Sequence, residues 1–355
     1  MNRRNFNIGV LSGLMIGFTT NLEAKSPLYI QNNQSEYELT KPDMIKLGDL
    51  VGLITPGTAV TDPDELSKAI EIVDYLGLKY KLGKYVKTGT GYKSRTIEER
   101  AEDLHSMFKD PEIKAVFCIR GGYGSIQILD YIDYKLIRNN PKVFLGYSDI
   151  TALHLAISKY SGLVTFHGPV MTSAFTEFTM NSLKQTIMNN QPIGKVTNPT
   201  VMNNFRKVHP IRTIKSGIAE GRLIGGNLSL ISALMGTKYE INTKDSILFL
   251  EDVGEEPFRI DRMLSQLKIA GKFRDAKGII FGECAGCNFD KLNSSRVWDF
   301  ALGEILDQAF SDLNIPIVYG MTIGHTSNQI TLPIGLKATL NSDEGSITIN
   351  ESAVI

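Results

Sequence analysis

Lys142-Val-Phe-Leu-Gly-Tyr-Ser148-Asp-Ile-Thr-Ala-Leu-His154 joins a short apolar strand directly to a helical pattern, with a serine at the turn. So tight a turn strains the backbone of its apical residue and holds the hydroxyl clear of the sheet. This arrangement is typical of a nucleophile elbow, which usually reads Gly-x-Ser-x-Gly. The fifth position here is Ile150, so the match is partial. A helix N-cap formed by Ser148 or Asp149 is the alternative interpretation.

Three further segments place polar or glycine-rich residues at the ends of predicted strands or in loops. The run 113–119 ends in Arg120-Gly-Gly-Tyr-Gly124, whose N–H groups suit an oxyanion, although a plain turn explains it as well. The run 246–250 delivers Glu251 and Asp252, between which periodicity does not choose. His325 lies in a glycine-bounded loop, so serine, acid and histidine follow the chain order of elbow-type hydrolases.

The alternation of strand and helix patterns predicts an α/β fold in two blocks. The first block reads as a doubly wound parallel sheet, and the second as a smaller α/β domain. Between them lies a polar stretch with three prolines, which we interpret as a linker. Expected first-block strands are 50–55, 78–82, 115–119, near 143 and 163–166, with helices 63–76, 97–108 and 176–188. Expected second-block strands lie near 221 and at 247–250, 278–281 and 316–319, with helices 228–235, 257–269 and 297–308.

The expected boundaries follow from these patterns. They are a signal peptide at 1–24, an extension at 25–44, a first domain at 45–188, a linker at 189–216 and a second domain at 217–355. The serine then comes from the first domain, and the acid and histidine come from the second. We therefore expect the active site in the cleft between the two domains.

Composition agrees with an enzyme of this size. The 355 residues are 42% hydrophobic, which is enough for a sizeable core. The 38 basic and 38 acidic residues balance, so no charge pattern indicates nucleic acid or a strongly anionic partner.

The three cysteines allow several interpretations. Cys118 falls in a predicted buried strand and reads as a small core residue. Cys284 and Cys287 form a Cys-x-x-Cys pair, which closes a disulfide in an oxidising compartment or serves redox or metal chemistry in a reducing one. The sequence leaves the disulfide open. No second ligand pair accompanies them, so we expect no metal site.

The N-terminus indicates export. A basic start with Arg3 and Arg4 precedes an apolar stretch over 8–18 and a small-residue ending at Leu22-Glu-Ala24. This stretch is too short to anchor a protein in a bilayer, so a periplasmic location without a membrane anchor is expected. The paired arginines resemble a twin-arginine export signal, but Asn2 replaces the usual Ser or Thr. Ordinary secretion is therefore an equal alternative.

With these motifs the sequence resembles the LD-carboxypeptidases, or muramoyltetrapeptide carboxypeptidases, a family that includes the microcin-C immunity peptidases. The resemblance covers roughly residues 45–350 and is carried by Gly-Tyr-Ser148-Asp-Ile-Thr, Arg-Gly-Gly-Tyr-Gly (120–124), Gly225-Gly-Asn-Leu-Ser229, Leu-Phe-Leu-Glu251-Asp-Val-Gly-Glu255, and Gly324-His325 with Leu332-Pro-Ile-Gly335.

The resemblance implies a serine nucleophile at Ser148, a base at His325 and its acid at Glu251. It also implies an oxyanion hole from the N–H groups of Asp149 and Gly122. The implied first domain is glutamine-amidotransferase-like or flavodoxin-like.

The activity it implies is removal of a C-terminal D-amino acid from murein tetrapeptides, in peptidoglycan turnover, without a cofactor. It also implies a homodimer. Alternatives are hydrolysis of an aminoacyl or peptidyl nucleotide, and non-catalytic muropeptide binding.

Several other polar residues have two interpretations each. Asn227 follows two glycines at a predicted helix start and is a candidate substrate contact or an N-cap. His167 follows a predicted strand and is a candidate substrate contact or a structural hydrogen-bonding residue. We interpret His105, His154 and His209 as packing or capping residues.

Overall fold

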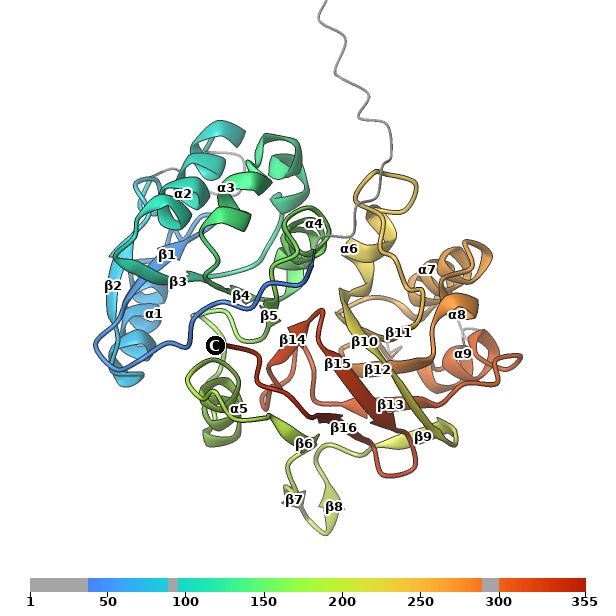
Figure 1. The fold of residues 1–355 in the computed structure, drawn as a ribbon. Helices are drawn as coiled ribbons and strands as arrows, with labels where there is room; N and C mark the ends of the chain where they lie inside the picture. The colour runs from blue at the N-terminus through green and yellow to red at the C-terminus, as the bar shows by residue number, and fades with distance from the viewer. Residues whose placement is uncertain (1–37, 89–94, 289–299) are drawn as a thin grey trace, which may run out of the picture. The chain divides into compact units, whose positions relative to one another are not determined.

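The computed structural model describes residues 38–88, 95–288 and 300–355, and these form two sheets with flanking helices (Figure 1). The predicted signal peptide lies outside the described residues, as do the first residues of the helix expected at 297–308. All described residues belong to one unit, Glu36–Ile355.

The first sheet has six strands in the order β14-β5-β4-β3-β1-β2. The five strands from the first block pair in parallel, and their order is the flavodoxin-like one. The order reverses between β1 and β3, so the glycine cluster after β3 lies at the carboxyl edge where such sheets place their sites. The strands are β1 (Leu50–Ile54), β2 (Lys79–Leu82), β3 (Ile113–Cys118), β4 (Val143–Gly146), β5 (Thr165–His167) and β14 (Leu332–Ile334).

Local sequence explains where the helices of this block begin. Asp62 caps the first helix before Pro63, and Thr96 with Glu99 forms a capping box at the second. The helical elements are α1 (Pro63–Tyr75), α2 (Ile97–Lys109), η1 (Ser125–Tyr131), α3 (Tyr134–Asn139), η2 (Ser148–Ile150), α4 (Thr151–Ser161) and α5 (Glu177–Ile187).

The second sheet has eight strands where the sequence predicts four, in the order β6-β16-β15-β10-β11-β12-β13-β9. Strands β10 to β13 are parallel, and the strands flanking them are antiparallel. The strands are β6 (Gly194–Thr197), β9 (Arg212–Lys215), β10 (Ile218–Asn227), β11 (Ser246–Val253), β12 (Gly278–Ala285), β13 (Ile317–Met321), β15 (Lys337–Asn341) and β16 (Ser346–Ile349). The helices are α6 (Leu228–Ala233), α7 (Pro257–Ile269), α8 (Lys272–Asp275) and α9 (Leu302–Ala309).

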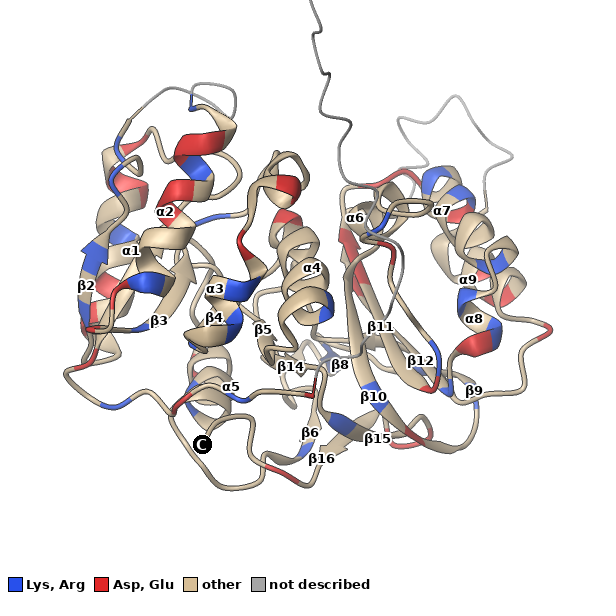
Figure 2. Cartoon of the chain, turned by 45° about the horizontal axis from the view of Figure 1, so that its top comes forward, with Lys and Arg blue, Asp and Glu red and all other residues tan. Residues whose placement is uncertain are grey.

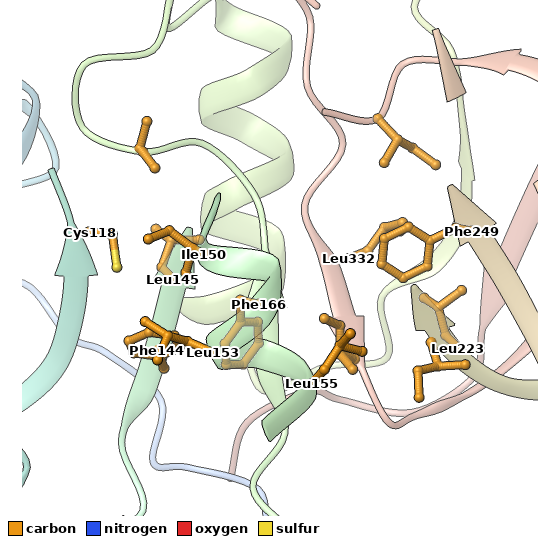
Figure 3. Packing of buried hydrophobic residues seen from close by; sticks show 14 of the residues in the cluster. Cys118, Phe144, Leu145, Ile150, Leu153, Leu155, Phe166, Leu223, Phe249 and Leu332 are labelled. Atoms are coloured by element: carbon orange, nitrogen blue, oxygen red, sulfur yellow. The ribbon is translucent and has the colours of Figure 1, made fainter. Parts of the chain in front are cut away.

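The two blocks share one hydrophobic core. Strand β14 lies within the second block in sequence, between β13 and β15, but pairs with β5 of the first sheet, with Leu332 opposite His167. Figure 3 shows Phe144, Leu145 and Phe166 on one side of this core and Leu332 and Phe249 on the other. Since all of these side chains are fully buried, the relative position of the two sheets rests on apolar packing.

The segment expected to be a linker, 189–216, is part of the second sheet. Its strands β6 and β9 form the two edges of that sheet, and β7 (Met202–Asn203) and β8 (Arg206–Lys207) form a hairpin. The three prolines, at 192, 199 and 210, lie outside these strands. The segment expected to be a linker therefore contributes two strands to the second sheet.

Charged residues of both signs occur on the helices, in agreement with the balanced composition. Basic and acidic residues intermix on helices such as α1, α2 and α7 (Figure 2). Cys284 and Cys287 form a disulfide at the end of β12, and Cys118 is a buried free thiol. In the described ranges, no helix combines the length and the hydropathy needed to cross a membrane.

Candidate active site

Ser148 lies at the turn between β4 and α4 with a φ of 65°, a left-handed conformation that is unfavourable for a residue with a side chain. Gly146 permits the turn, since a Cβ there would crowd Ile150 at 3.0 Å. Gly121 faces the serine in the same way, because a Cβ on it would lie 3.2 Å from Ser148 Oγ. The predicted elbow geometry is present although the fifth residue is Ile150.

His325 and Glu251 come from the second block and meet this serine. His325 Nε2 lies 3.1 Å from Ser148 Oγ, and His325 Nδ1 lies 2.8 Å from Glu251 Oε2. Glu251 lies in the buried part of β11 and has no exposed surface, whereas His325 and Ser148 are half-buried. A carboxylate only accepts hydrogen bonds, so Nδ1 carries the proton and Nε2 is free to accept from the serine.

The loop that carries His325 is shaped around Glu251. Gly324 has a φ of +81°, and a Cβ on it would overlap the Glu251 carboxylate. The backbone N–H of His325 also lies 3.4 Å from Glu251 Oε2. Only glycine therefore lets the loop pass this close to the carboxylate.

The environment of His325 favours its protonated form. Burial alone would lower the pKa, but the hydrogen bond and charge of Glu251, with the charge of Asp252, outweigh it and raise the pKa above the ordinary value. The ring of Tyr147 packs edge-on against the imidazole, with 4.7 Å between ring centroids. A base of raised pKa that is held against a serine hydroxyl is suited to proton transfer.

Asp252, next to Glu251, binds the start of α6 through its carboxylate. Its carboxylate accepts hydrogen bonds from Ser229 N at 2.9 Å, Ser229 Oγ at 2.8 Å and Asn227 Nδ2 at 3.2 Å. Burial and the charge of Glu251 raise the pKa of Asp252, although these bonds oppose the shift. The structure thus distinguishes the two acids, which periodicity does not.

The glycine turn lies beside the elbow. Gly122 has a φ of 95°, and within the described chain its N–H has no hydrogen-bond acceptor. Asp149 is buried, and its Oδ2 accepts from Ser125 N at 2.9 Å. Burial raises the pKa of Asp149, although that bond and the Arg100 charge oppose the shift. The side chain of Asp149 therefore anchors the turn and leaves only its backbone N–H as a candidate oxyanion donor.

The two candidate substrate contacts are buried. Asn227 caps α6 by accepting from Leu230 N at 3.2 Å, and its side chain is committed to that bond and to Asp252. His167 is fully buried, packed against Phe249, and burial lowers its pKa well below the ordinary value. His167 presents no surface to a substrate, so the expectation of a contact there is corrected.

Two contacts that support the site were missed from the sequence. Thr151 Oγ1 accepts from Asn227 N at 3.0 Å and so ties the elbow helix to the end of β10. Tyr147 supplies the ring against His325. Both residues stand in the elbow motif itself, but their partners lie more than seventy positions away in the chain. In the described residues, no cluster of three metal-ligating side chains occurs.

Comparison with known proteins relates both blocks to one family. Residues 51–168 match the LD-carboxypeptidase N-terminal domain, and residues 220–340 match the LD-carboxypeptidase C-terminal domain. The chain belongs to the LD-carboxypeptidase family. Both blocks that contribute residues to the site are therefore related to peptidase domains.

Individual relatives of the family have two kinds of name. The "Probable murein peptide carboxypeptidase" of Bacillus subtilis is 40% identical over 309 residues, covering 87% of this chain and 94% of the relative. The "Microcin C7 self-immunity protein MccF" of Escherichia coli is 32% identical, covering 86% and 94%. The structure of muramoyltetrapeptide carboxypeptidase from Oxalobacter formigenes has a TM-score of 0.71 at 28% identity, covering 85% and 98%. Carboxypeptidases of murein and microcin-immunity proteins thus share this architecture.

Proposed function

We propose that this protein is a serine LD-carboxypeptidase that removes C-terminal D-alanine from murein tetrapeptides. The observation that carries the proposal is that the His325 ring lies between Ser148 Oγ and Glu251, with contacts of 3.1 and 2.8 Å. Its three members occupy the positions that the family motif assigns to nucleophile, base and acid. The preference for an L-centre followed by a D-residue rests on family membership alone.

The geometry supports nucleophilic acyl transfer. His325 Nε2 takes the proton of Ser148 as Oγ attacks the carbonyl carbon of the scissile amide, and later gives that proton to the leaving amine. Glu251 holds the ring in the tautomer with a proton on Nδ1 and stabilises the imidazolium. Water then hydrolyses the acyl-enzyme by the same route in reverse.

The oxyanion of the tetrahedral intermediate needs donors beside Ser148. We assign this role to the backbone N–H groups of Asp149 and Gly122, because the glycine turn packs against the elbow and the Gly122 N–H is unpaired in the described chain. One such donor is typically worth about 3 kcal/mol of barrier.

The expected location follows from the N-terminal sequence. Its basic start, short apolar stretch and small-residue ending would direct the chain to the periplasm, where murein is accessible. An oxidising compartment also suits the Cys284–Cys287 disulfide.

Hydrolysis of an aminoacyl nucleotide is the second candidate. It is favoured by likeness to MccF, whose structure in complex with aspartyl sulfamoyl adenosine has a TM-score of 0.78 at 28% identity. Export of the present chain would separate it from an intracellular nucleotide. Plain muropeptide binding does not explain why the serine, histidine and glutamate are aligned.

The proposal is tested by release of D-alanine from a purified disaccharide tetrapeptide. Ser148→Ala should lower kcat by roughly 10⁶-fold, the scale seen when a serine nucleophile is removed. Ser67→Ala, on the exposed start of α1, is the matched control and should leave kcat unchanged. A folded wild type that releases no D-alanine but hydrolyses an aminoacyl sulfamoyl adenosine would replace the proposed substrate with the second one.

A further inference from the structure

A second histidine–glutamate pair lies one strand away from the first. His209 Nδ1 is 2.7 Å from Glu283 Oε1, and His209 Nε2 is 2.8 Å from Asn328 Nδ2. Glu283 stands in β12, which pairs in parallel with the strand β11 that carries Glu251. Asn328 lies three residues after His325 in the same loop. His209 therefore contacts the loop of the catalytic histidine and none of the reacting atoms.

The hydrogen bonds of this group run in one direction. The Thr176 hydroxyl donates to Asn328 Oδ1 at 2.7 Å, which leaves the amide nitrogen to face His209. The Glu283 carboxylate only accepts, so the His209 proton lies on Nδ1 and Nε2 accepts from Asn328. Glu283 therefore sets the tautomer of His209 just as Glu251 sets that of His325.

Burial makes these bonds strong constraints. The His209 side chain is 4% exposed and Asn328 is 9% exposed, so water does not replace a lost partner. A buried polar group left unpaired typically costs about 1–3 kcal/mol. The loop is thus held at Asn328 by bonds that are costly to break.

The same segment holds the beginning of the loop. Asn198 Oδ1 accepts from Thr322 N at 2.8 Å, and Asn198 Nδ2 donates to Gly320 O at 2.8 Å. Residues 198 and 209 thus contact the chain on both sides of His325. The segment 189–216, which the sequence suggests is only a connection, contributes side chains that fix the histidine loop.

We propose that His209 is a positioning residue for His325, acting through Asn328. The proposal rests on the proposed function, because it assumes that His325 is the base for Ser148. Its physical content is that the His209–Asn328 bond keeps the loop where His325 Nε2 lies 3.1 Å from Ser148 Oγ. A shift of a fraction of an ångström there reduces the rate of the chemical step and leaves substrate binding intact.

Two substitutions separate the two hydrogen bonds of His209, because each keeps one bond and removes the other. In His209→Asn the amide nitrogen replaces Nδ1 and keeps the bond to Glu283, but the acceptor for Asn328 is lost. In His209→Gln the amide oxygen replaces Nε2 and keeps the acceptor for Asn328, but the donor to Glu283 is lost. The first variant should lower kcat about tenfold with KM unchanged, and the second should keep kcat within about twofold. Equal kcat in both variants would overturn the proposal.

A second variant keeps the test valid if His209→Asn does not fold. Asn328→Ala removes the same bond from the other partner, together with the bond from Thr176, and should lower kcat by at least the same factor. The double variant should be no slower than Asn328→Ala alone, because His209→Asn then has no bond to Asn328 left to break. Additive losses would show that His209 acts by another path and would overturn the proposal.

The rate at which a fluorophosphonate labels Ser148 separates this proposal from the proposed function, because labelling needs the base but no murein substrate. His209→Asn should slow labelling about tenfold, as it slows kcat. A wild type that is labelled, with His209→Asn labelled equally fast, overturns the positioning role alone. A wild type that neither releases D-alanine nor reacts with the probe overturns both.

Discussion

Ser148 and His325 approach to 3.1 Å, but the two halves of the molecule hold them in different ways. Ser148 is held by its own backbone, at a φ of 65° between a strand and a helix that are contiguous in sequence. His325 lies in a loop without regular secondary structure and is held by side chains that come from distant segments.

This difference separates local from long-range determinants of a catalytic site. The strain at Ser148 is maintained because β4 and α4 are both buried and cannot relax. The loop of His325 has no regular structure of its own and is held by Glu251, by Tyr147 and by hydrogen bonds at Thr322 and Asn328. Substitutions on the serine side should therefore affect backbone strain, and those on the histidine side should affect hydrogen bonding and pKa.

Among residues other than the nucleophile itself, the largest expected effect is on the histidine side. Glu251→Gln replaces the carboxylate with a neutral amide whose NH2 group can face Nδ1 and favour the wrong tautomer, so it should lower kcat by about 10⁴-fold, as the acid-to-amide change in a serine triad does. Activity needs neutral His325, so wild-type kcat/KM should fall as pH drops through a pKa raised above its usual value near 6.5. Without the Glu251 charge this acid limb should move to lower pH.

The pH profile of kcat/KM checks this, with Glu344→Gln at the far end of the second sheet as the control that keeps both rate and profile. An acid limb that stays in place in Glu251→Gln would mean that Glu251 does not determine the protonation of His325.

A smaller effect is expected at Gly324. Gly324→Ala should lower kcat about 100-fold, because its Cβ would displace the Glu251 carboxylate and with it the imidazole. Gly236→Ala is the matched control, with a φ of +79° and no atom within 4 Å of the new Cβ. Both should lose about 1 kcal/mol of folding free energy from the left-handed backbone. Steady-state kinetics and denaturant unfolding separate the two effects, and equal kcat in the two variants would contradict this reading of the loop.

The smallest expected effect is on the serine side and concerns stability. Ser148→Gly should be more stable than Ser148→Ala by about 1 kcal/mol, because glycine adopts a φ of 65° without strain. Both variants lack the hydroxyl, so the difference reports the backbone alone. Urea unfolding of the two proteins measures it. Equal stability would show that the elbow stores no strain.

The contiguous features of this chain were predictable from sequence. The elbow, the strands β1 to β5 and the helix α7 depend on apolar periodicity and on residues adjacent in the chain. Asp149, by contrast, turns its carboxylate to Ser125, a contact that no local pattern indicates. His209, interpreted as a packing or capping residue, makes polar contacts to Glu283 and Asn328 that bring together three separate segments.

The strands that the prediction missed are edge or antiparallel ones. β6, β9, β15 and β16 are short or partly exposed, so their apolar signal is weak. β14 has a strong apolar signal, but its pairing with β5 spans more than 160 residues. Pairing over such distances is decided by the surface that the folded sheet offers and not by the strand's own residues.

The sequence by itself determined the α/β alternation, the sharp strand-to-helix turn and the candidates Ser148, His325 and the adjacent acids Glu251 and Asp252, because backbone preference and motif spacing act over a few residues. Tertiary structure alone decided that Glu251 and not Asp252 faces His325, that His167 is buried, and that the segment 189–216 joins the second sheet. Each of these outcomes depends on which surfaces meet across the fold. Contacts between segments that are distant in sequence determine side-chain direction and burial, and no local sequence pattern indicates them.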